Sequence, residues 1–347
     1  VSLDDAAGLR ELLEPCAAVI ACAGPFTAHG EPVVAAAAET GTHYLDTTGE
    51  QEFMRMVFDR YGELASRGGA ILVPAMGFDY VPGDMIAALT AAGMGALDEL
   101  ALAYSVKGFG MSRGTMHSGL RIIGGGGVEY RDRELRPTSG SVDRGTWEFP
   151  PPVGTQRMIR YPGGEQITVP RHVDARSVST MFSAATVLPS ARLAPAAPVL
   201  MPLMRLAMRT PLRRAGDALI TRLPEGPDEE ARRASRFMIS CEARAAATRR
   251  RATITGADVY GLTAFAIVHA ALLAAAPGYE ARGALAPSQA FDPEDFLSSL
   301  AEFGVDYEVD PPHGGSAGRG APKARRGGKA PIAPLRGASP GAPLHER

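Results

Sequence analysis

The chain has 347 residues, which is enough for two domains of ordinary size and a sizeable buried core. Its 36 basic and 38 acidic residues give a formal net charge of -2, so the overall charge gives no reason to expect nucleic acid as a partner. The three cysteines are widely spaced, and no spacing of Cys, His, Asp or Glu is typical of a metal site. We therefore expect reduced, buried thiols, no disulfide and no bound metal.

The N-terminus lacks the basic stretch and apolar core of a secretory signal. The longest uncharged apolar run, residues 262–276, contains His269 and is shorter than the roughly 20 residues that cross a bilayer. We predict a buried core helix there and a cytoplasmic location.

Short apolar runs and helical patterns alternate through the first 95 residues. Strands are predicted at residues 17–22, 43–47 and 70–74, and a helix with one apolar face at 51–66. Parallel strands separated by single helices require right-handed crossovers. This region therefore predicts part of a doubly wound parallel sheet, a partial Rossmann-type NAD(P)-binding domain over residues 1–95.

The pattern changes near residue 97, where strand-like segments follow one another mostly without helices. Their predicted ranges are 100–106, 127–130, 146–149, 158–161, 166–169, 178–184, 237–245 and 249–255, with one helix at 114–123. This favours a second α+β domain with a mixed or antiparallel sheet over residues 96–258. Helices and a strand at 305–309 are predicted to pack back on the core within 259–310, and the composition of 311–347 predicts a disordered tail.

Three predicted loops leave the carboxyl ends of the parallel strands, where ligands bind in such sheets. They are rich in Gly, Pro and small polar residues, which let a backbone approach a flat ligand, although the same residues could simply make turns. Three such loops at one sheet edge favour a nucleotide or nicotinamide site. Its predicted residues are Ala23, Gly24, Pro25, Phe26, Thr48, Gly49, Met76, Gly77 and Phe78.

Asp79 is the acidic residue that we single out as a catalytic candidate. It comes just before a helix opened by Pro82, so it could be a helix N-cap that accepts bonds from free backbone N–H groups. The alternative is a group that orients substrate or transfers a proton. His29 and His117 are further candidates for proton transfer, although lone loop histidines are usually just solvated.

A second glycine loop lies at residues 108–114. Its GxGxxxG spacing, with no second parallel strand soon after it, argues against a dinucleotide-binding loop. The helix that follows, with Gly114, Thr115 and Ser118, instead predicts a site offering donors to a substrate carboxylate or carbonyl. No P-loop or Ser/His/Asp arrangement supports a hydrolase.

An insertion at residues 193–223 mixes apolar and basic side chains, such as Leu203 and Met204 beside Arg205 and Arg209. Such a segment could make peripheral membrane contact through residues 194–223 or lie against a partner helix. Core packing or a homodimer contact is the alternative that we prefer.

Several segments resemble those of a known family in their amino-acid sequence and in their order along the chain. They are CAGPF at 22–26, YLDTTGE at 44–50, GFDYVPGD at 77–84, RGTMHS at 113–118, YGLTA at 260–264 and GALAP at 283–287. Together they resemble the saccharopine dehydrogenase-like oxidoreductases, a group that includes the trans-acting enoyl reductases of mycobacterial lipid synthesis. The resemblance covers residues 1 to about 310.

The resemblance implies a Rossmann domain that binds NADP or NAD and a second domain that closes over a small-molecule or lipid-linked substrate. It implies reduction of an enoyl or keto group. The family's glycine-rich loop should follow a strand upstream of Val1, so we expect an N-terminally truncated chain that binds NAD(P) weakly, with the enzyme activity expected of the full-length form. The alternative is a non-catalytic lipid-associated or scaffolding protein that retains the fold.

Overall fold

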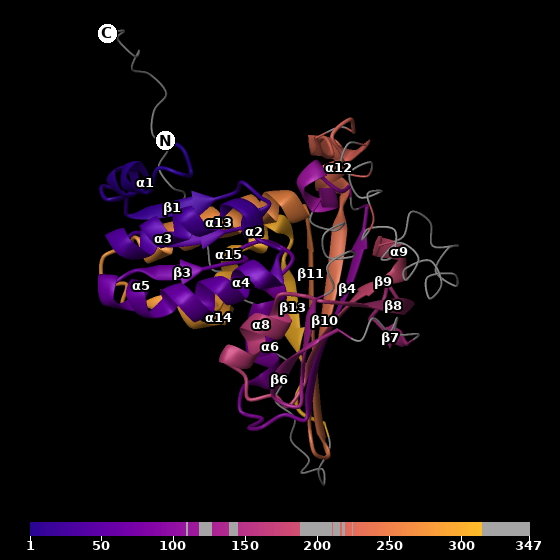
Figure 1. Cartoon of the computed structure of the whole chain (residues 1–347). Helices are drawn as coiled ribbons and strands as arrows, with labels where there is room; N and C mark the ends of the chain where they lie inside the picture. The colour runs from indigo at the N-terminus through magenta and orange to yellow at the C-terminus, as the bar shows by residue number, and fades with distance from the viewer. Residues whose placement is uncertain are drawn as a thin grey trace.

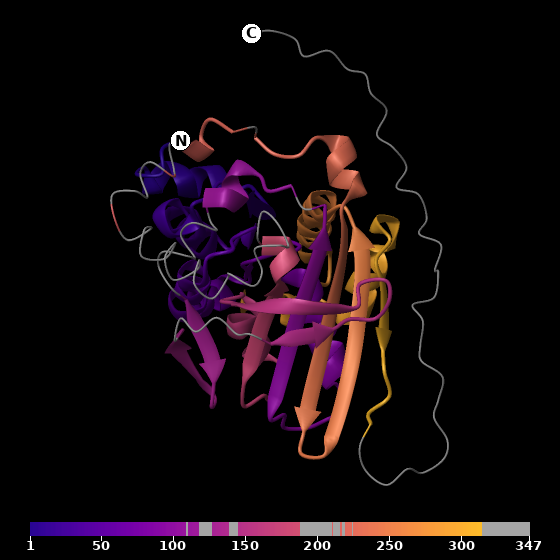
Figure 2. The same ribbon diagram turned by 90° about the vertical axis from the view of Figure 1, so that its right-hand side faces the viewer.

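The computed structural model describes residues 1–108, 110–117, 127–138, 145–187, 210, 216, 219–223 and 225–313. Within these residues the chain forms two sheets (Figure 1). Figure 1 shows the smaller sheet with its helices on the left and the larger sheet edge-on at the right. Figure 2 shows the larger sheet from its face.

The smaller sheet is parallel, as the sequence predicts. Its order is β1-β2-β3-β12, formed by β1 (Ala18–Ala21), β2 (His43–Asp46), β3 (Ile71–Val73) and β12 (Gly283–Ala284). All three residues of β3 are buried, which fits a strand covered by helices on both faces. The two-residue strand β12 was not predicted, because two residues are too short for a recognisable pattern.

The helices that connect and cover these strands also follow the predicted order. They are α1 (Ala6–Leu13), α2 (Phe26–His29), α3 (Glu31–Thr40), α4 (Gln51–Met56), a π-helical turn η1 (Val57–Tyr61), α5 (Gly62–Gly68), α6 (Val81–Ala91), α13 (Val259–Ala274), α14 (Pro287–Ala290) and α15 (Pro293–Ser299). α3 is followed by its C-cap Gly41, whose φ of 74° is left-handed. A Cβ there would lie 2.7 Å from the carbonyl oxygen of Gly68, so this turn requires glycine.

The larger sheet is mixed, because β4 pairs parallel with β9 while its other pairings are antiparallel. In the described residues it has nine strands in the order β13-β11-β10-β4-β9-β5-β6, with β8 pairing β9 and β7 pairing β8. The strands are β4 (Glu99–Lys107), β5 (Val128–Arg131), β6 (Glu134–Pro137), β7 (Thr146–Glu148), β8 (Thr155–Tyr161), β9 (Val178–Ser183), β10 (Arg236–Ala245), β11 (Thr248–Ala257) and β13 (Asp306–Val309). The predicted α/β class with a parallel sheet and a mixed sheet is confirmed.

One hydrophobic core joins the two sheets. Alternate residues of β4, including Leu100, Leu102 and Tyr104, pack in the same cluster as Ile71 of β3 and Ile254 of β11. Helix α6 lies in this layer and contacts β10 and β11. The shared core therefore fixes the position of the larger sheet relative to the loops that follow β1, β2 and β3.

One secondary-structure prediction is wrong, and another can be compared with the structure only in part. Residues 166–169 were predicted as a strand, but α8 (Glu165–Thr168) and the 3-10 turn η2 (Val169–Arg171) occupy this segment. Its β-branched residues favour a strand, but all four α8 residues are buried between the sheets and tertiary packing overrides that preference. A helix was expected at residues 114–123. The structure has a helix at residues 113–117, and residues 118–123 lie outside the described residues.

Cys16 and Cys22 are exposed, so the prediction of three buried thiols is wrong for these two. Cys16 follows the end of α1, and Cys22 follows β1, which is an edge strand. Cys241 is buried in the core, and burial raises the pKa of its thiol to about 12. All three are free, without disulfides.

Most of the insertion at 193–223 and all of the tail after residue 313 lie outside the described residues. No helix within the described part of the chain is long and apolar enough to cross a membrane. The apolar run predicted as a core helix forms most of α13, whose Leu262, Ala266 and Ala270 are buried.

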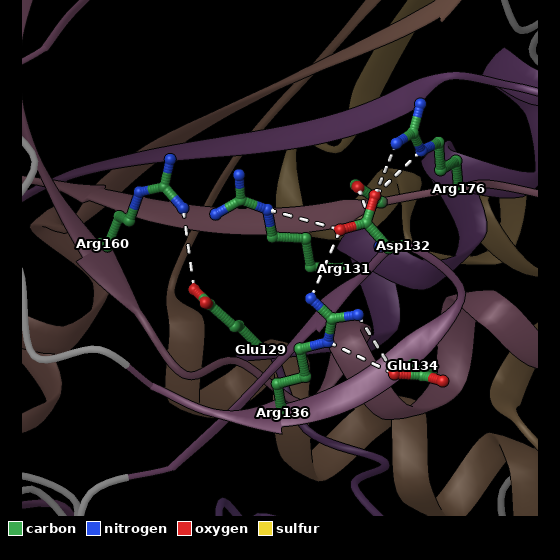
Figure 3. Close-up of polar contacts among 8 residues, drawn as sticks. Glu129, Arg131, Asp132, Glu134, Arg136, Arg160 and Arg176 are labelled. Atoms are coloured by element: carbon green, nitrogen blue, oxygen red, sulfur yellow. Dashed lines mark hydrogen bonds and ion pairs between the residues drawn. The ribbon is translucent and has the colours of Figure 1, made fainter.

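A charged network covers the β5–β6 hairpin (Figure 3). Asp132 accepts hydrogen bonds from Nε and Nη2 of Arg176 at 2.9 and 2.8 Å, and Arg136 lies 3.4 Å from its other oxygen. The hydrogen bond from Arg176 is the main reason that the pKa of Asp132 is lowered. Because these side chains are exposed and screened by salt, the network is a solvated surface rather than a source of stability.

Candidate functional site

The loops that follow β1 and β2 are joined by the side chain of Glu50. Its Oε1 accepts a hydrogen bond from the backbone N–H of Phe26 at 2.8 Å, and its Oε2 accepts one from the backbone N–H of Thr27 at 3.0 Å. The Thr27 hydroxyl also donates to Oε2. Glu50 is only 7% exposed, so these bonds form in a largely dry environment where a lost partner is costly.

The loops that follow β2 and β3 are joined by Asp46, the last residue of β2. Its Oδ1 accepts from the backbone N–H groups of Thr48 and Ala75 at 2.8 and 2.9 Å, and its carbonyl oxygen accepts from Met76 at 2.7 Å. Full burial raises the pKa of Asp46 to about 7, although the two Oδ1 hydrogen bonds oppose that shift. Oδ2 has no hydrogen bond of normal geometry in the described residues, while the nearby Tyr44 hydroxyl interacts with the carboxyl group electrostatically.

A third contact completes the connection, because the Tyr80 hydroxyl donates to the carbonyl oxygen of Gly49 at 3.1 Å. Gly24, Gly49 and Gly77 thus lie in three loops that are held together at one edge of the parallel sheet. The three glycines therefore lie at the same edge of the sheet and not on different faces of the molecule.

The predicted cofactor residues differ in how they could reach a ligand. Ala23 and Gly24 are exposed, and Pro25 and Gly49 are half-buried. The side chains of Phe26, Thr48, Met76 and Phe78 are at most 5% exposed and pack inward, so these residues could contact a ligand only through their backbone. Gly77 is buried as well; a Cβ there would lie 3.4 Å from Thr263 of α13.

These loops fit one part of a dinucleotide better than another. The backbone N–H groups of Phe26 and Thr27, at the start of α2, are already used by the Glu50 carboxylate. A pyrophosphate would find its donors occupied and a negative charge beside it. The exposed backbone at residues 23–24 and the half-buried Gly49 fit a flat group without a phosphate, such as a nicotinamide with its ribose.

Asp79 follows these loops and is not a helix cap. The N-cap of α6 is Tyr80, and no side chain caps this helix, so the capping interpretation of Asp79 is wrong. Its carboxyl group has no hydrogen bond among the described residues. Water reaches the side chain, yet enough protein surrounds the carboxyl group that desolvation raises the pKa of Asp79 to about 6. A free carboxyl group that titrates near neutrality is suited to proton transfer.

Two hydroxyl groups, those of Tyr80 and Tyr161, lie close to Asp79. Tyr161 of β8 hydrogen-bonds with Tyr80, and its pKa is raised first by burial and then by the negative charge of Asp79. Tyr161 therefore stays protonated at all physiological pH values and can donate a hydrogen bond. The larger sheet thus contributes a polar group beside the loops of the smaller one.

Glu165 of α8 is the centre of a second buried polar group. It accepts hydrogen bonds from the Tyr104 hydroxyl and, at 3.1 Å, from the Thr180 hydroxyl. Full burial raises the pKa of Glu165 to about 8, so the carboxyl group is largely protonated at neutral pH. The sequence analysis missed this residue; the preceding Gly163–Gly164 pair, where a Cβ on Gly163 would lie 2.3 Å from Glu165, was the available signal.

Asp84 and His172 form a third polar contact at this interface. Asp84 Oδ1 lies 2.9 Å from His172 Nε2, and Oδ2 accepts from the backbone N–H of Ser288 at 2.8 Å. Complete burial would raise the pKa of Asp84, but the interaction with His172 and these hydrogen bonds outweigh it, so the pKa is lowered. This contact ties α6 to η2 and α14, and its role is structural.

The predicted substrate residues at the second glycine loop do not offer the expected free donors. The backbone N–H of Thr115 donates to Ser112 Oγ at 3.1 Å, so Ser112 caps this helix. The Thr115 hydroxyl lies 3.2 Å from the Tyr260 hydroxyl of α13. Gly114 is exposed, and Ser118 lies outside the described residues.

The same loop does line a large cavity. Gly108, Gly110 and Met111 contribute to a space of about 1820 Å³ at the end of the larger sheet. None of the nine predicted cofactor residues lines it. The two places are nevertheless adjacent, because the ring of Phe237 in the cavity wall lies 4.7 Å from the ring of Phe78, centroid to centroid.

No family model matches the chain. A saccharopine dehydrogenase-like oxidoreductase of Bos taurus is 35% identical over 79 residues, which are 23% of this chain and 18% of that protein. A trans-acting enoyl reductase of Mycobacterium ulcerans is 42% identical over 79 residues, 23% of this chain and 19% of that protein. The matched part therefore spans about a fifth of the length of these relatives.

Among solved structures, apo saccharopine dehydrogenase (L-Glu forming) from Saccharomyces cerevisiae superposes with a TM-score of 0.51 and 13% sequence identity. The superposition covers 90% of this chain and 88% of that chain, and at this identity it shows the fold alone. The chain is thus similar over part of its length to a saccharopine dehydrogenase-like oxidoreductase and a trans-acting enoyl reductase, and it shares its fold with saccharopine dehydrogenase.

Proposed function

We propose that this chain belongs to an NAD(P)-dependent oxidoreductase whose reaction takes place at the edge of the parallel sheet formed by β1, β2 and β3. The observation that supports this most directly is the connection of three loops at that edge by Glu50, Asp46 and Tyr80, with the free carboxyl group of Asp79 beside them. Relatives named as an oxidoreductase and an enoyl reductase support hydride transfer as the reaction class.

In this proposal the nicotinamide group supplies or accepts hydride, and the chain's own residues do the rest. The backbone at Ala23, Gly24 and Gly49 holds the flat ring, and the buried Phe26 and Phe78 keep these loops rigid from beneath. Asp79 moves a proton to or from the substrate, since its pKa of about 6 lets it exchange protons near neutral pH. Tyr161 holds a proton next to Asp79 and excludes bulk water on that side.

We propose the enoyl or keto group of a lipid-linked or small organic molecule as the substrate, because one matched relative is named a trans-acting enoyl reductase. The coenzyme is NADP or NAD. Binding should be weak in this chain, with Kd above about 100 μM, because the backbone N–H groups of Phe26 and Thr27 already donate to Glu50 and are not available to a pyrophosphate.

Calorimetric titration with NADPH and NADH, followed by an assay of NADPH oxidation with an α,β-unsaturated ketone, tests the proposal. Gly24→Trp should abolish nucleotide binding by filling the exposed edge, whereas Gly114→Trp should not. Asp79→Asn should lower kcat by roughly 10²–10³-fold and remove a pH dependence near pH 6, with little effect on nucleotide affinity.

Asp59→Asn, at an exposed position of η1, is the matched control and should behave as the unmodified chain. Absence of nucleotide binding even at millimolar concentration would overturn the proposal. A folded chain with that result would instead support a non-catalytic lipid-associated or scaffolding role.

A further inference from the structure

Residues 49–51, between β2 and α4, contact three different segments of the chain. The carbonyl oxygen of Gly49 accepts from the Tyr80 hydroxyl at 3.1 Å, and the Glu50 carboxylate binds the loop that follows β1. Gln51, the first residue of α4, extends its side chain to the larger sheet. Figure 1 shows α4 close to α8 where the two sheets meet, and these two helices are in contact.

The Gln51 amide makes three hydrogen bonds with the backbone of distant segments. Its Nε2 donates to the carbonyl oxygens of Gly163 and Val128 at 2.8 and 3.1 Å. Its Oε1 accepts from the backbone N–H of Val128, the first residue of β5, at 2.8 Å. Gln51 is 8% exposed, so water cannot readily replace these bonds when the amide is removed.

The segment that Gln51 binds begins directly after Tyr161. β8 ends at Tyr161, and residues 162–164, the β8–α8 loop, lead to α8. A Cβ on Gly164 would lie 2.9 Å from Cδ1 of Tyr80, so only a glycine lets the loop pack this closely on the ring of Tyr80. The loop therefore contacts the smaller sheet's side of the molecule at two places, the Gln51 amide and the Tyr80 ring.

These contacts close a ring of covalent and hydrogen-bonded links. The chain runs from Gly49 to Gln51, the Gln51 amide binds Gly163, and Gly163 lies two residues after Tyr161. Tyr161 hydrogen-bonds with Tyr80, whose hydroxyl donates to the carbonyl oxygen of Gly49. Tyr161 is thereby held on two sides, through its backbone by Gly163 and through its hydroxyl by Tyr80. Loss of one link in such a network loosens the others.

Asp79 precedes Tyr80 in the chain and interacts with the same ring of contacts. The pKa values of Tyr80, Tyr104 and Tyr161 are raised first by burial and also by the charge of Asp79. Desolvation raises the pKa of Asp79 itself to about 6, and no basic side chain within the described residues opposes that shift. The titration of Asp79 is therefore sensitive to how closely the protein surrounds its carboxyl group.

We infer that Gln51 is a positioning residue: by binding Gly163 and Val128 it fixes the β8–α8 loop, and with it Tyr161, beside Asp79. Backbone groups occupy the Gln51 amide, so it acts through Tyr161 and not on a substrate directly. The importance of this placement for hydride transfer rests on the proposed function, because Asp79 and Tyr161 must then meet the same substrate. The placement of Tyr161 itself does not depend on it.

The titration of Asp79 tests the inference without coenzyme or turnover. Carboxyl ¹³C NMR of the aspartate-labelled chain from pH 4 to pH 9 follows the titration, and the signal that Asp79→Asn lacks identifies the residue. Gln51→Leu keeps a buried side chain of similar size and removes all three hydrogen bonds. The loop should withdraw, water should enter, and the pKa of Asp79 should fall to about 5 or lower.

Gln156→Leu is the matched control. Gln156 lies on β8 as Tyr161 does, and its Nε2 also donates to a backbone carbonyl oxygen, that of Val153, at 3.1 Å. Because Gln156 has no contact with the ring of links that includes Gln51, its replacement should leave the titration of Asp79 unchanged. Circular dichroism shows whether each variant is folded.

Gly164→Ala opens the ring at a different place. Its Cβ would press on the buried ring of Tyr80 and push the β8–α8 loop away while the Gln51 amide stays intact, so the pKa of Asp79 should fall here as well. This variant decides the question if Gln51→Leu does not fold.

An unchanged titration of Asp79 in folded Gln51→Leu would overturn the inference, and so would an equal fall in Gln156→Leu. If Gln51→Leu is unfolded, an unchanged titration in Gly164→Ala has the same meaning. Failure of nucleotide binding would overturn the proposed function and leave this result intact, because the titration uses the chain alone.

Discussion

Oε1 of Glu50 lies 2.8 Å from the backbone nitrogen of Phe26, and this hydrogen bond joins two loops that are 24 residues apart in the sequence. A carboxylate from the second loop therefore occupies the backbone donors that the first loop would otherwise present to a ligand. The bond stabilises the edge of the sheet and at the same time removes a site for a phosphate.

Glu50→Gln should destabilise the chain by about 1–3 kcal/mol, because an amide NH₂ group would face the N–H donors of Phe26 and Thr27 and leave one of them unsatisfied. Urea unfolding followed by circular dichroism measures the change. Glu52→Gln, at the exposed position two residues on, should leave the midpoint where it is. Equal midpoints for the two variants would show that the loop connection contributes nothing to stability.

Stability should fall as the pH rises from about 4 to 8. Burial raises the pKa of Asp46 to about 7 and of Glu165 to about 8. Each group binds its proton more tightly in the folded chain, so its contribution is complete below the ordinary pKa near 4 and is lost as the pH passes the raised pKa. Asp84 has the opposite effect on the pH dependence of stability. Because its pKa is lowered in the folded chain, its contribution to stability is lost as the pH falls into the acid range.

Urea midpoints measured from pH 4 to pH 9 test this predicted decline in stability. In Glu165→Gln the part of the decline between about pH 7 and 8 should disappear, since only the pKa of Glu165 lies above that of Asp46. Glu148→Gln, an exposed position on β7, should retain the decline. A profile that is flat from pH 5 to pH 8 in the unmodified chain would contradict the prediction.

The buried contact between Asp84 and His172 should be worth far more than a surface ion pair. His172→Ala leaves the Asp84 carboxylate without its main partner in a fully buried position and should cost about 3 kcal/mol. Asp84→Asn should cost a similar amount, and the double variant less than the sum of the two, because both remove the same interaction.

Arg133→Ala, which breaks the exposed ion pair with Asp174, is the matched control and should not shift the midpoint measurably. Additive losses in the Asp84/His172 double-mutant cycle would mean that the two side chains do not act on each other.

The sequence by itself determined the parallel sheet and its three loops. Fully apolar runs such as residues 70–74, followed by Gly-containing loops and separated by amphipathic helices, fit few structures other than buried parallel strands. Local patterns also predicted most strands of the larger sheet, because alternation and turn residues act over short distances. They failed at residues 165–168, where burial between two sheets overrides the preference of β-branched residues for strands.

Only the tertiary structure decided which side chains meet. The approach of Glu50 to Phe26, of Tyr161 to Tyr80 and of Lys107 to Arg236 depends on contacts between segments far apart in the chain, and no local pattern encodes them. The raised pKa values of Asp79 and Glu165 have the same origin, since desolvation is set by the atoms that surround a carboxyl group rather than by its sequence neighbours. Periodicity specifies which face of an element is buried, whereas packing specifies what that face touches.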